Sequence, residues 1–346
     1  MTTKINSIIE DMNRTEGFSG VISIKLDGKT VHESAYGYAD FPNRRPNKLD
    51  TKFVTASAGK AFTATGILQL IENGRLSLDS TIGSLLDFDL KQIDPAVTVR
   101  QLLTHTSGTP DYADESVAQS YADLFIDYPC YKVRTNRDVI PMFIDMPMQY
   151  SPGDHLHYNS GGFVILALIM EILTNMPFDD YLKQMVFTPC VMSDTSFQEY
   201  DRPEPNTANV YIPDRERGGY YTNIYSSTAK GMGDGGAFTT VGDLERFWHG
   251  LYDGKLIGQE LLAEMTKPQT PERCYGYGLW MEELGGRFIP HFEGCEPGIA
   301  CLSTYDVERD LLINIITNKG NDIWKMNREF LRCFYSDVPD SFYYGE

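Results

Sequence analysis

Residues 20–35 read Gly-Val-Ile-Ser-Ile-Lys-Leu-Asp-Gly-Lys-Thr-Val-His-Glu-Ser-Ala. Within them, Gly20–Lys25 and Thr30–Ala35 alternate in polarity, as β-strands do when one face is buried. The dipeptide Asp27-Gly28 lies between the two runs and favours the tight turn of a β-hairpin. We therefore predict two antiparallel strands near the start of the chain.

The other end of the chain carries a second hairpin pattern. Two apolar, β-branched runs, Ile299–Tyr305 and Leu311–Thr317, are separated by the polar segment Asp306–Asp310. Helical patterns lie outside the two hairpins, at residues 4–13 and 322–333. Because strands occur at both ends, the simplest architecture is an α+β fold in which both termini build one antiparallel sheet with helices on its faces.

The middle of the chain contains helical runs and long loops. We expect a mostly helical lobe over residues 89–234, inserted into an α/β lobe made of residues 1–88 and 235–346, with the active site between the lobes. Residues 109–153 are rich in Tyr, Asp and Pro and show little periodicity. A long irregular stretch of this kind is usually a binding loop or a lid.

The first candidate for catalysis is Ser57-Ala-Gly-Lys60, which opens a helical run over residues 58–73 that Gly74 closes. Positions i and i+3 share one face of a helix, so the Lys60 amine would lie beside the Ser57 hydroxyl. The positive end of the helix dipole favours an alkoxide, and a lowered amine pKa would let Lys60 take the hydroxyl proton. The plainer alternative is that Ser57 only caps the helix.

The same spacing occurs a second time, in Ser227-Thr-Ala-Lys230. The two copies differ in context, because Ser57 opens an apolar helix whereas Ser227 lies in a Gly-rich segment. This difference favours Ser57 as the nucleophile.

The second candidate is Tyr158 in Tyr158-Asn-Ser160, just before the helical run Gly161–Leu173. A phenol here would shuttle a proton between nucleophile and leaving group if a nearby lysine lowered its pKa. The alternative is that Tyr158 is one of 21 tyrosines and simply packs its ring.

Histidine and glycine patterns predict neither a metal site nor a phosphate loop. Asp154-His-Leu-His157 looks like a metal cluster, but no third and fourth ligands follow at a useful spacing. His105 has no acidic partner visible in the sequence, so we expect it to bond the loop backbone rather than act as a base. The run Gly233–Gly236 lacks the Gly-Lys-Ser/Thr ending of a phosphate loop.

Composition narrows the range of partners and locations. The chain has 346 residues and 30 basic against 48 acidic side chains, a net charge of −18 that disfavours nucleic acid and anionic membranes as partners. The six cysteines form no CxxC pair, so neither a zinc knuckle nor a disulfide framework is expected. The N-terminal residues show no apolar signal-peptide core, and the longest apolar stretch, Gly161–Met170, is shorter than the ~20 residues that span a bilayer. We therefore expect a cytoplasmic protein.

With these residues in view, the chain resembles the serine β-lactamase and penicillin-binding protein family, in the branch of class C β-lactamases, D-alanyl-D-alanine carboxypeptidases, D-aminopeptidases and related esterases. The resemblance runs from about Phe18 to Asn318 and depends on the order of several segments rather than on any one of them. These segments are Phe18–Val21, Tyr36–Asp40, Ser57–Lys60, Ile67–Asp79, Val99–Gly108, Tyr150–Gly153, Gly235–Thr240 with Asp243-Leu244, and Tyr277–Trp280.

The resemblance implies a role for each matching residue. Ser57 is similar to the acylated nucleophile of the family, and Lys60 to the base that activates it. Tyr158 resembles the tyrosine of the family's Tyr-x-Asn motif, which shares proton transfer with that lysine. At the Asn position this chain has Ser160, whose hydroxyl still donates a hydrogen bond over a shorter reach.

The family's third motif, Lys-Thr-Gly or His-x-Gly, departs further from the pattern. The matching segment is Phe292-Glu-Gly294, followed by Cys295, so a phenylalanine stands at the cationic position. His291 is one residue earlier and should face away from the site, unless a bulge restores it as a substrate-binding residue. The backbone N–H groups of Ser57 and Cys295 would form the oxyanion hole, with Gly294 beside them.

These observations lead to two functional hypotheses. In the first, the chain is a serine hydrolase that forms an acyl-enzyme with a small ester, amide or peptide, needs no cofactor and no metal, and uses β-lactams poorly because the cation for a substrate carboxylate is missing. An esterase or a D-amino-acid peptidase or amidase fits this hypothesis. In the second, the changes at Ser160 and Phe292 mark a ligand-binding or sensing protein on the same fold, with little turnover.

Overall fold

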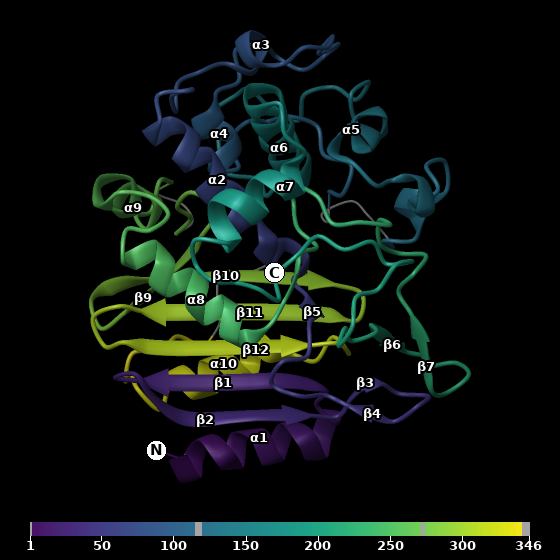
Figure 1. Cartoon of the computed structure of the whole chain (residues 1–346), viewed down its shortest axis with the longest axis vertical. Coiled ribbons are helices and arrows are strands. Elements are labelled where there is room, and N and C mark those ends of the chain that lie inside the picture. The colour runs from purple at the N-terminus through teal and green to yellow at the C-terminus, as the bar shows by residue number, and fades with distance from the viewer. Residues whose placement is uncertain (1, 115–119, 271–273, 341–346) are drawn as a thin grey trace.

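The computed structural model describes residues 2–114, 120–270 and 274–340. Within these residues, six strands form one antiparallel sheet in the order β2-β1-β12-β11-β10-β9. Their bounds are Gly20–Leu26 (β1), Lys29–Tyr36 (β2), Trp280–Leu284 (β9), Arg287–Glu296 (β10), Ile299–Asp306 (β11) and Leu311–Thr317 (β12). Strand β1 pairs with β12, so both ends of the chain build the sheet, as predicted (Figure 1).

The first hairpin turns where the sequence indicates. Asp27 and Gly28 have φ angles of 51° and 64°. Positive φ at both central residues is the geometry of a type I′ turn, which matches the twist of the flanking strands. The second hairpin joins β11 to β12 in a continuous register from Ala300–Thr317 to Asp306–Leu311. The predicted α+β fold with an antiparallel sheet is therefore confirmed.

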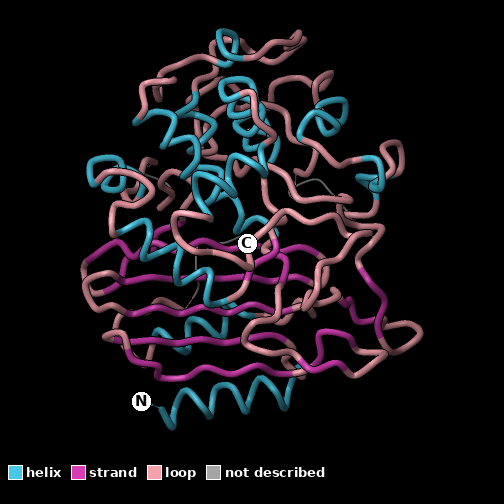
Figure 2. The backbone as a smooth tube through the Cα atoms, in the orientation of Figure 1, coloured by secondary structure: helices cyan, strands magenta, loops and turns pink. Residues whose placement is uncertain are grey.

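Helices cover both faces of the sheet and gather above it (Figures 1 and 2). The longer ones are α1 (Thr2–Glu16), α2 (Lys60–Glu72), α6 (Ser160–Thr174), α8 (Val241–Tyr252) and α10 (Ile323–Leu331). The shorter ones are α3 (Ile82–Leu85), α4 (Val99–Leu103), α5 (Asn136–Val139), α7 (Phe178–Leu182) and α9 (Gln259–Met265).

Short elements connect these layers. The 3₁₀ turns are η1 (Ala56–Gly59), η2 (Asp123–Phe125), η3 (Cys130–Lys132) and η4 (Ile140–Met142), and a π-helical segment spans Lys183–Phe187. Three two-stranded pairs join β3 (Tyr38–Asp40) to β4 (Arg45–Pro46), β5 (Phe53–Val54) to β8 (Phe238–Thr239), and β6 (Tyr211–Pro213) to β7 (Tyr220–Thr222).

The alternation of side chains along the strands divides the apolar core in two. On β12, Leu312 and Ile316 belong to the larger core, which includes α2, α6 and α8. Leu311, Ile313 and Ile315 point to the opposite face, where they pack with α1 and α10. Burying both faces of a strand explains why this run is apolar apart from Asn314 and Thr317.

Helix α6 runs through the larger core, and its residues from Ser160 to Met170 are buried. None of the helices in the described ranges is, on its own, long and apolar enough to cross a membrane. Helix α6 and the segment Phe178–Phe187 reach that length and composition only together, with a bend of 80° between them. Helices α3 to α7 lie at the end of the molecule away from α1 (Figure 1), and we retain the division into two lobes as a proposal.

Candidate active site

Ser57 lies in the 3₁₀ turn η1, and helix α2 begins only at Lys60. Ala56 has a φ of 47°, a left-handed conformation that costs a non-glycine residue about 1–2 kcal/mol. Neither Thr55 nor Gly59, the residues that precede η1 and α2, makes a side-chain capping bond. The helix thus starts three residues after Ser57, which is not at a cap position.

Two glycines hold the backbone of this turn at close range. A β-carbon at Gly294 would lie 2.6 Å from the amide nitrogen of Ser57 and 2.2 Å from the carbonyl oxygen of Thr55. A β-carbon at Gly235 would lie 2.2 Å from the carbonyl oxygen of Ala56. Contacts this short exclude any side chain, so these glycines allow β10 and the segment before β8 to meet at Ser57. The glycine run around Gly235 therefore shapes the active-site backbone.

The Lys60 ammonium sits at the centre of the site, and the residue is only 2% exposed. Its Nζ donates to Ser57 Oγ at 3.1 Å, to Ser160 Oγ at 3.3 Å and to the Asp234 carbonyl oxygen at 2.7 Å. The contact with the Asp234 carbonyl could not be predicted from the sequence, because every residue has a backbone carbonyl and none is marked by its side-chain type. This geometry brings Ser57, Lys60 and Ser160 together as predicted.

Tyr158 joins this group through its ring. The Lys60 Nζ lies over the ring, 4.8 Å from its centroid, at a distance typical of cation–π contacts. On another side, the ring stacks with Trp280 at a centroid distance of 6.1 Å and an interplanar angle of 11°. Tyr158 is therefore held between a buried cation and an aromatic cluster, and the two candidate motifs meet.

Asp111 is a buried group that the sequence analysis missed. Its carboxylate accepts from the backbone amides of Ser160 at 2.8 Å, Gly161 at 3.0 Å and Ala113 at 3.1 Å. Two of these amides belong to the first turn of α6, where the helix dipole favours an anion. Burial nevertheless raises the pKa of Asp111 to about 6, against the effect of those hydrogen bonds and of Lys60. The sequence indicated this group only by an acidic residue in the irregular stretch that follows Gly108.

His105 bonds the backbone, as predicted. Its Nδ1 accepts from the Asn159 amide at 3.1 Å, so Nε2 carries the proton and lies 3.0 Å from the Tyr275 hydroxyl. Burial and the charge of Lys60 lower the pKa of His105 well below its usual value. A neutral imidazole with both nitrogens engaged supports the loop and the approach to α6, and does not serve as a base.

His291 requires a correction as a candidate substrate-binding residue. The pairing of β10 with β9 and β11 runs through this position without a shift in register, so no bulge turns His291 toward the site. The ring is 4% exposed and lies with Trp324 and Asn327 in a cavity beneath α10, where burial lowers its pKa to about 3. Its neighbour on the same face, Glu293, accepts from Trp324 Nε1 at 2.6 Å.

The other residues of this segment take the opposite face or the strand edge. Phe292 packs in the core with Phe62 and Trp248 and lies outside the pocket beside Ser57. Pairing with β9 ends at His291, so the edge of β10 beyond it lies next to η1. Gly294 is in direct contact with η1, and Cys295 follows it with an exposed side chain. The Cys295 amide as the second oxyanion donor remains a proposal.

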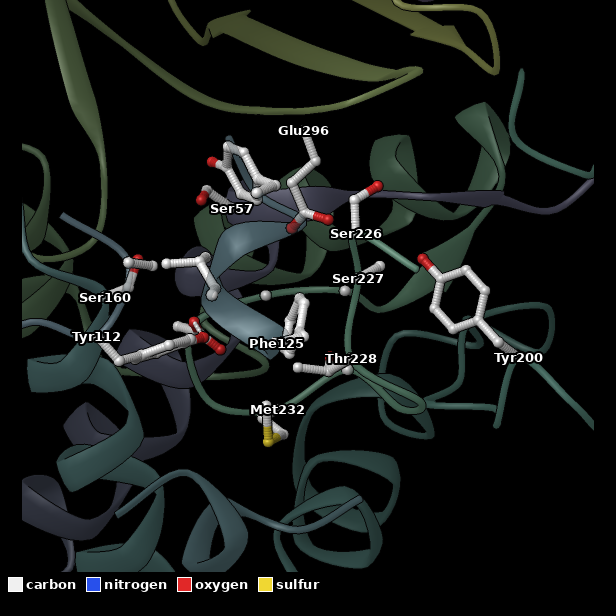
Figure 3. A pocket seen from close by; sticks show the side chains of 17 residues that line it. Ser57, Tyr112, Phe125, Ser160, Tyr200, Ser226, Ser227, Thr228, Met232 and Glu296 are labelled. Atoms are coloured by element: carbon white, nitrogen blue, oxygen red, sulfur yellow. Dashed lines mark hydrogen bonds between the residues drawn. The ribbon is translucent and has the colours of Figure 1, made fainter. Parts of the chain in front are cut away.

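A pocket of about 570 Å³ that is open to solvent lies beside Ser57 (Figure 3). Ser57 and Ser160 lie on one side of it, and aromatic residues that include Tyr112 and Tyr200 form its walls. The Tyr112 hydroxyl donates to the Asp234 carboxylate at 2.5 Å, which fixes that wall. Ser57 is thus accessible to a small molecule.

The second copy of the serine–lysine spacing has a different partner. Lys230 pairs with the carboxylate of Asp179 at 2.5 Å. Ser227 lines the pocket, but its lysine is committed to an acid on α7. The prediction that Ser57 rather than Ser227 is the nucleophile fits this arrangement.

The histidines of the 154–157 segment also pair with acids. His155 lies 3.1 Å from Asp154, and His157 lies 3.4 Å from Asp114. Across residues 2–114, 120–270 and 274–340, no group of three or more His, Cys, Asp or Glu side chains is arranged to hold a metal ion.

Known proteins match this chain over most of its length. A model of the Beta-lactamase family matches residues 5–332. The crystal structure of a penicillin-binding protein from Bacillus halodurans superposes with a TM-score of 0.89 and 32% identity, covering 95% of this chain and all of that one.

Curated relatives extend the comparison. Penicillin-binding protein 4* from Bacillus subtilis is 27% identical over 338 residues, which cover 92% of this chain and 72% of that protein. D-aminopeptidase from Brucella anthropi is 28% identical over 298 residues, which cover 83% of this chain but only 53% of that protein.

Proposed function

The chain belongs to the Beta-lactamase family of serine hydrolases, and from this premise we propose that Ser57 is acylated by a small amide, peptide or ester. The observation that carries the proposal is the 3.1 Å contact between Lys60 Nζ and Ser57 Oγ, inside a site that also engages Ser160 and the Asp234 carbonyl. A nucleophile and its base within hydrogen-bond reach, with the base oriented by further groups, is the arrangement that nucleophilic catalysis needs.

In the first step, once the Lys60 ammonium has lost a proton to solvent, Ser57 Oγ attacks the substrate carbonyl carbon while its proton moves to the neutral amine of Lys60. The carbonyl π electrons move to oxygen, and the oxyanion is stabilised by the amides of Ser57 and Cys295. Ser160 Oγ and the Asp234 carbonyl accept from Lys60 and hold the amine in line with Ser57. Burial of Lys60 favours its neutral form and so its action as a base.

In the second step, the tetrahedral intermediate collapses and the bond to the leaving group breaks. The proton held by Lys60 passes through the Tyr158 hydroxyl to the leaving nitrogen or oxygen, which departs neutral. Water then attacks the acyl-enzyme, returns a proton through the same pair and releases the acid. The contact between the Lys60 ammonium and the Tyr158 ring supports a shared role in both steps.

The proposed substrate is a small molecule without a carboxylate beside the reacting bond, because Phe292 packs in the core and the described lining of the pocket offers no Lys, Arg or His to hold one. A charge-assisted hydrogen bond of that kind contributes about 1.5–3 kcal/mol. We therefore expect kcat/KM for nitrocefin to be at least about tenfold below that for p-nitrophenyl acetate or butyrate. Equal or better use of nitrocefin would mean that another cation binds the β-lactam carboxylate.

Pre-steady-state kinetics with p-nitrophenyl acetate test the proposal itself. A hydrolase that works through Ser57 releases a burst of about one p-nitrophenol per active site and then continues to turn over, and Ser57→Ala abolishes both phases. A burst without turnover, or no burst at all, would favour the alternative of a binding or sensing protein with little turnover.

A further inference from the structure

The pocket beside Ser57 contains a carboxylate that the proposed reaction does not use. Glu296 is the last residue of β10, two positions after Gly294. Residues i and i+2 of a strand share a face, so Glu296 lies on the face where Gly294 meets Ser57, about 7 Å further along the strand. Figure 3 shows its carboxylate directed into the pocket among the lining side chains.

The charge in this pocket is negative. Glu296 and Asp234 both line it, and its described lining residues include no Lys, Arg or His. Burial raises the pKa of Tyr112 and of Tyr200, and the negative charge of Glu296 adds to this effect at both residues. The charge of Glu296 is therefore felt at both aromatic walls of the pocket. A carboxylate that faces the pocket attracts a cationic group and repels an anionic one.

The pocket lies on a side of Ser57 that does not include Tyr158. Its described lining residues include Ser57 and Ser160 but not Tyr158, the proposed proton donor to the leaving group. The leaving group would depart toward Tyr158, so the pocket holds the acyl part of the substrate. Its aromatic walls, Tyr112 and Tyr200 with Phe125, suit an apolar side chain on that acyl part.

We propose that Glu296 binds a protonated amine on the acyl group, so that the preferred substrates are aminoacyl amides, peptides or esters with a free amino group. The inference deepens the proposed function and rests on it, because it takes the acyl group to be the one transferred to Ser57. Glu296 is then the residue that separates free-amine substrates from N-acylated ones, while Ser57, Lys60 and Tyr158 perform the chemistry.

Turnover of matched substrates tests the proposal. The substrates are D- and L-phenylalanine p-nitroanilide, their N-acetyl derivatives, and p-nitrophenyl acetate, each with wild type, Glu296→Gln and Glu296→Asp. We expect a free-amine preference of about 10- to 100-fold for at least one enantiomer, lost in Glu296→Gln and partly kept in Glu296→Asp. The preference should also fall as pH rises through the substrate amine pKa, near 8. Hydrolysis of p-nitrophenyl acetate should change less than about threefold, and an equal loss on all substrates would overturn the proposal.

A binding measurement separates failure of this proposal from failure of the proposed function. In the Ser57→Ala background, calorimetry with D- and L-phenylalaninamide and their N-acetyl forms needs no catalysis. Tighter binding of a free amine by about tenfold or more, abolished by adding Glu296→Gln, supports the inference even where no substrate turns over. Equal affinity for the free and N-acetylated amides would overturn it, while p-nitrophenyl acetate turnover still reports separately on Ser57.

Discussion

The chain contains the Ser-x-x-Lys spacing twice, and the two copies show what the spacing alone leaves open. Lys60 is buried and turns its amine to Ser57 Oγ, Ser160 Oγ and a backbone carbonyl. Lys230 is part-buried and turns its amine to the Asp179 carboxylate. The Asp179 carboxylate at hydrogen-bond distance stabilises the ammonium form of Lys230, whereas Lys60 donates to three neutral oxygens and its near-complete burial disfavours the charged form. Burial and hydrogen-bond partners, rather than sequence spacing, distinguish the proposed catalytic pair from the second copy.

The largest expected difference between the copies lies at the serines. Ser57→Ala should lower kcat for p-nitrophenyl acetate by at least about 10³-fold, because no other group replaces the nucleophile. Ser227→Ala should stay within about threefold of wild type. Full activity in Ser57→Ala with a loss in Ser227→Ala would reverse the assignment.

The lysines should differ in the same way, and Tyr158 extends the test. Lys60→Ala and Tyr158→Phe should each lower kcat by roughly 10²- to 10⁴-fold, as expected for loss of positioned acid–base catalysis. Because the two groups act as one proton-transfer unit, the double variant should lose much less than the product of the two factors. Lys230→Ala serves as the control and should keep near-normal kcat. Multiplicative losses in the double variant would count against a shared unit.

The backbone around Ser57 supplies a third test, since Gly235 and Gly294 pack against the Ser57 amide. Gly294→Ala would place a β-carbon 2.6 Å from the Ser57 nitrogen and must displace that amide. We expect a loss in kcat of about 10²-fold, similar to removal of one oxyanion donor. Gly242→Ala on α8 is the matched control, because the nearest atom to its β-carbon is 3.5 Å away on a flexible arginine. Near-UV circular dichroism checks that both variants fold, and a folded, fully active Gly294→Ala would remove the close contact from the account.

Asp111 is expected to have the smallest effect, visible in the pH profile. Its pKa, raised to about 6, means that it protonates as the pH falls below 6, which removes an anion from the neighbourhood of Lys60 and Ser160. Wild-type kcat/KM should therefore decline below pH 6, and Asp111→Asn should flatten that limb while lowering activity at pH 8 by roughly tenfold. Asp154→Asn, at an exposed carboxylate in the segment before α6, should leave the profile unchanged. An acid limb that persists in Asp111→Asn would assign it to another group.

Much of the fold could be predicted because it depends on local signals. Asp27-Gly28 specifies a turn by its backbone preference, and the apolar runs of β11 and β12 reflect burial on both faces. The start of α2 was less visible, because the left-handed Ala56 and the 3₁₀ turn after it are imposed by contacts with Gly235 and Gly294.

The arrangement of the site was predictable where side-chain type and helical spacing bring two residues together, as with Ser57 and Lys60. It was not predictable where distant segments supply backbone atoms or buried acids, as with the Asp234 carbonyl and Asp111. For His291, strand alternation predicted that the side chain faces away from the site. A bulge in β10 would have turned it toward the site, and only the continuous register of the strand excludes that bulge.

The most direct test of the central claim is the site of covalent labelling. Wild-type protein would be treated with a fluorophosphonate, digested and mapped by peptide mass spectrometry, with Lys60→Ala and Lys230→Ala in parallel. We predict a single phosphonyl adduct on the peptide that contains Ser57, strongly slowed in Lys60→Ala and unaffected in Lys230→Ala. An adduct on the peptide that contains Ser227, or labelling of Ser57 that does not depend on Lys60, would contradict it.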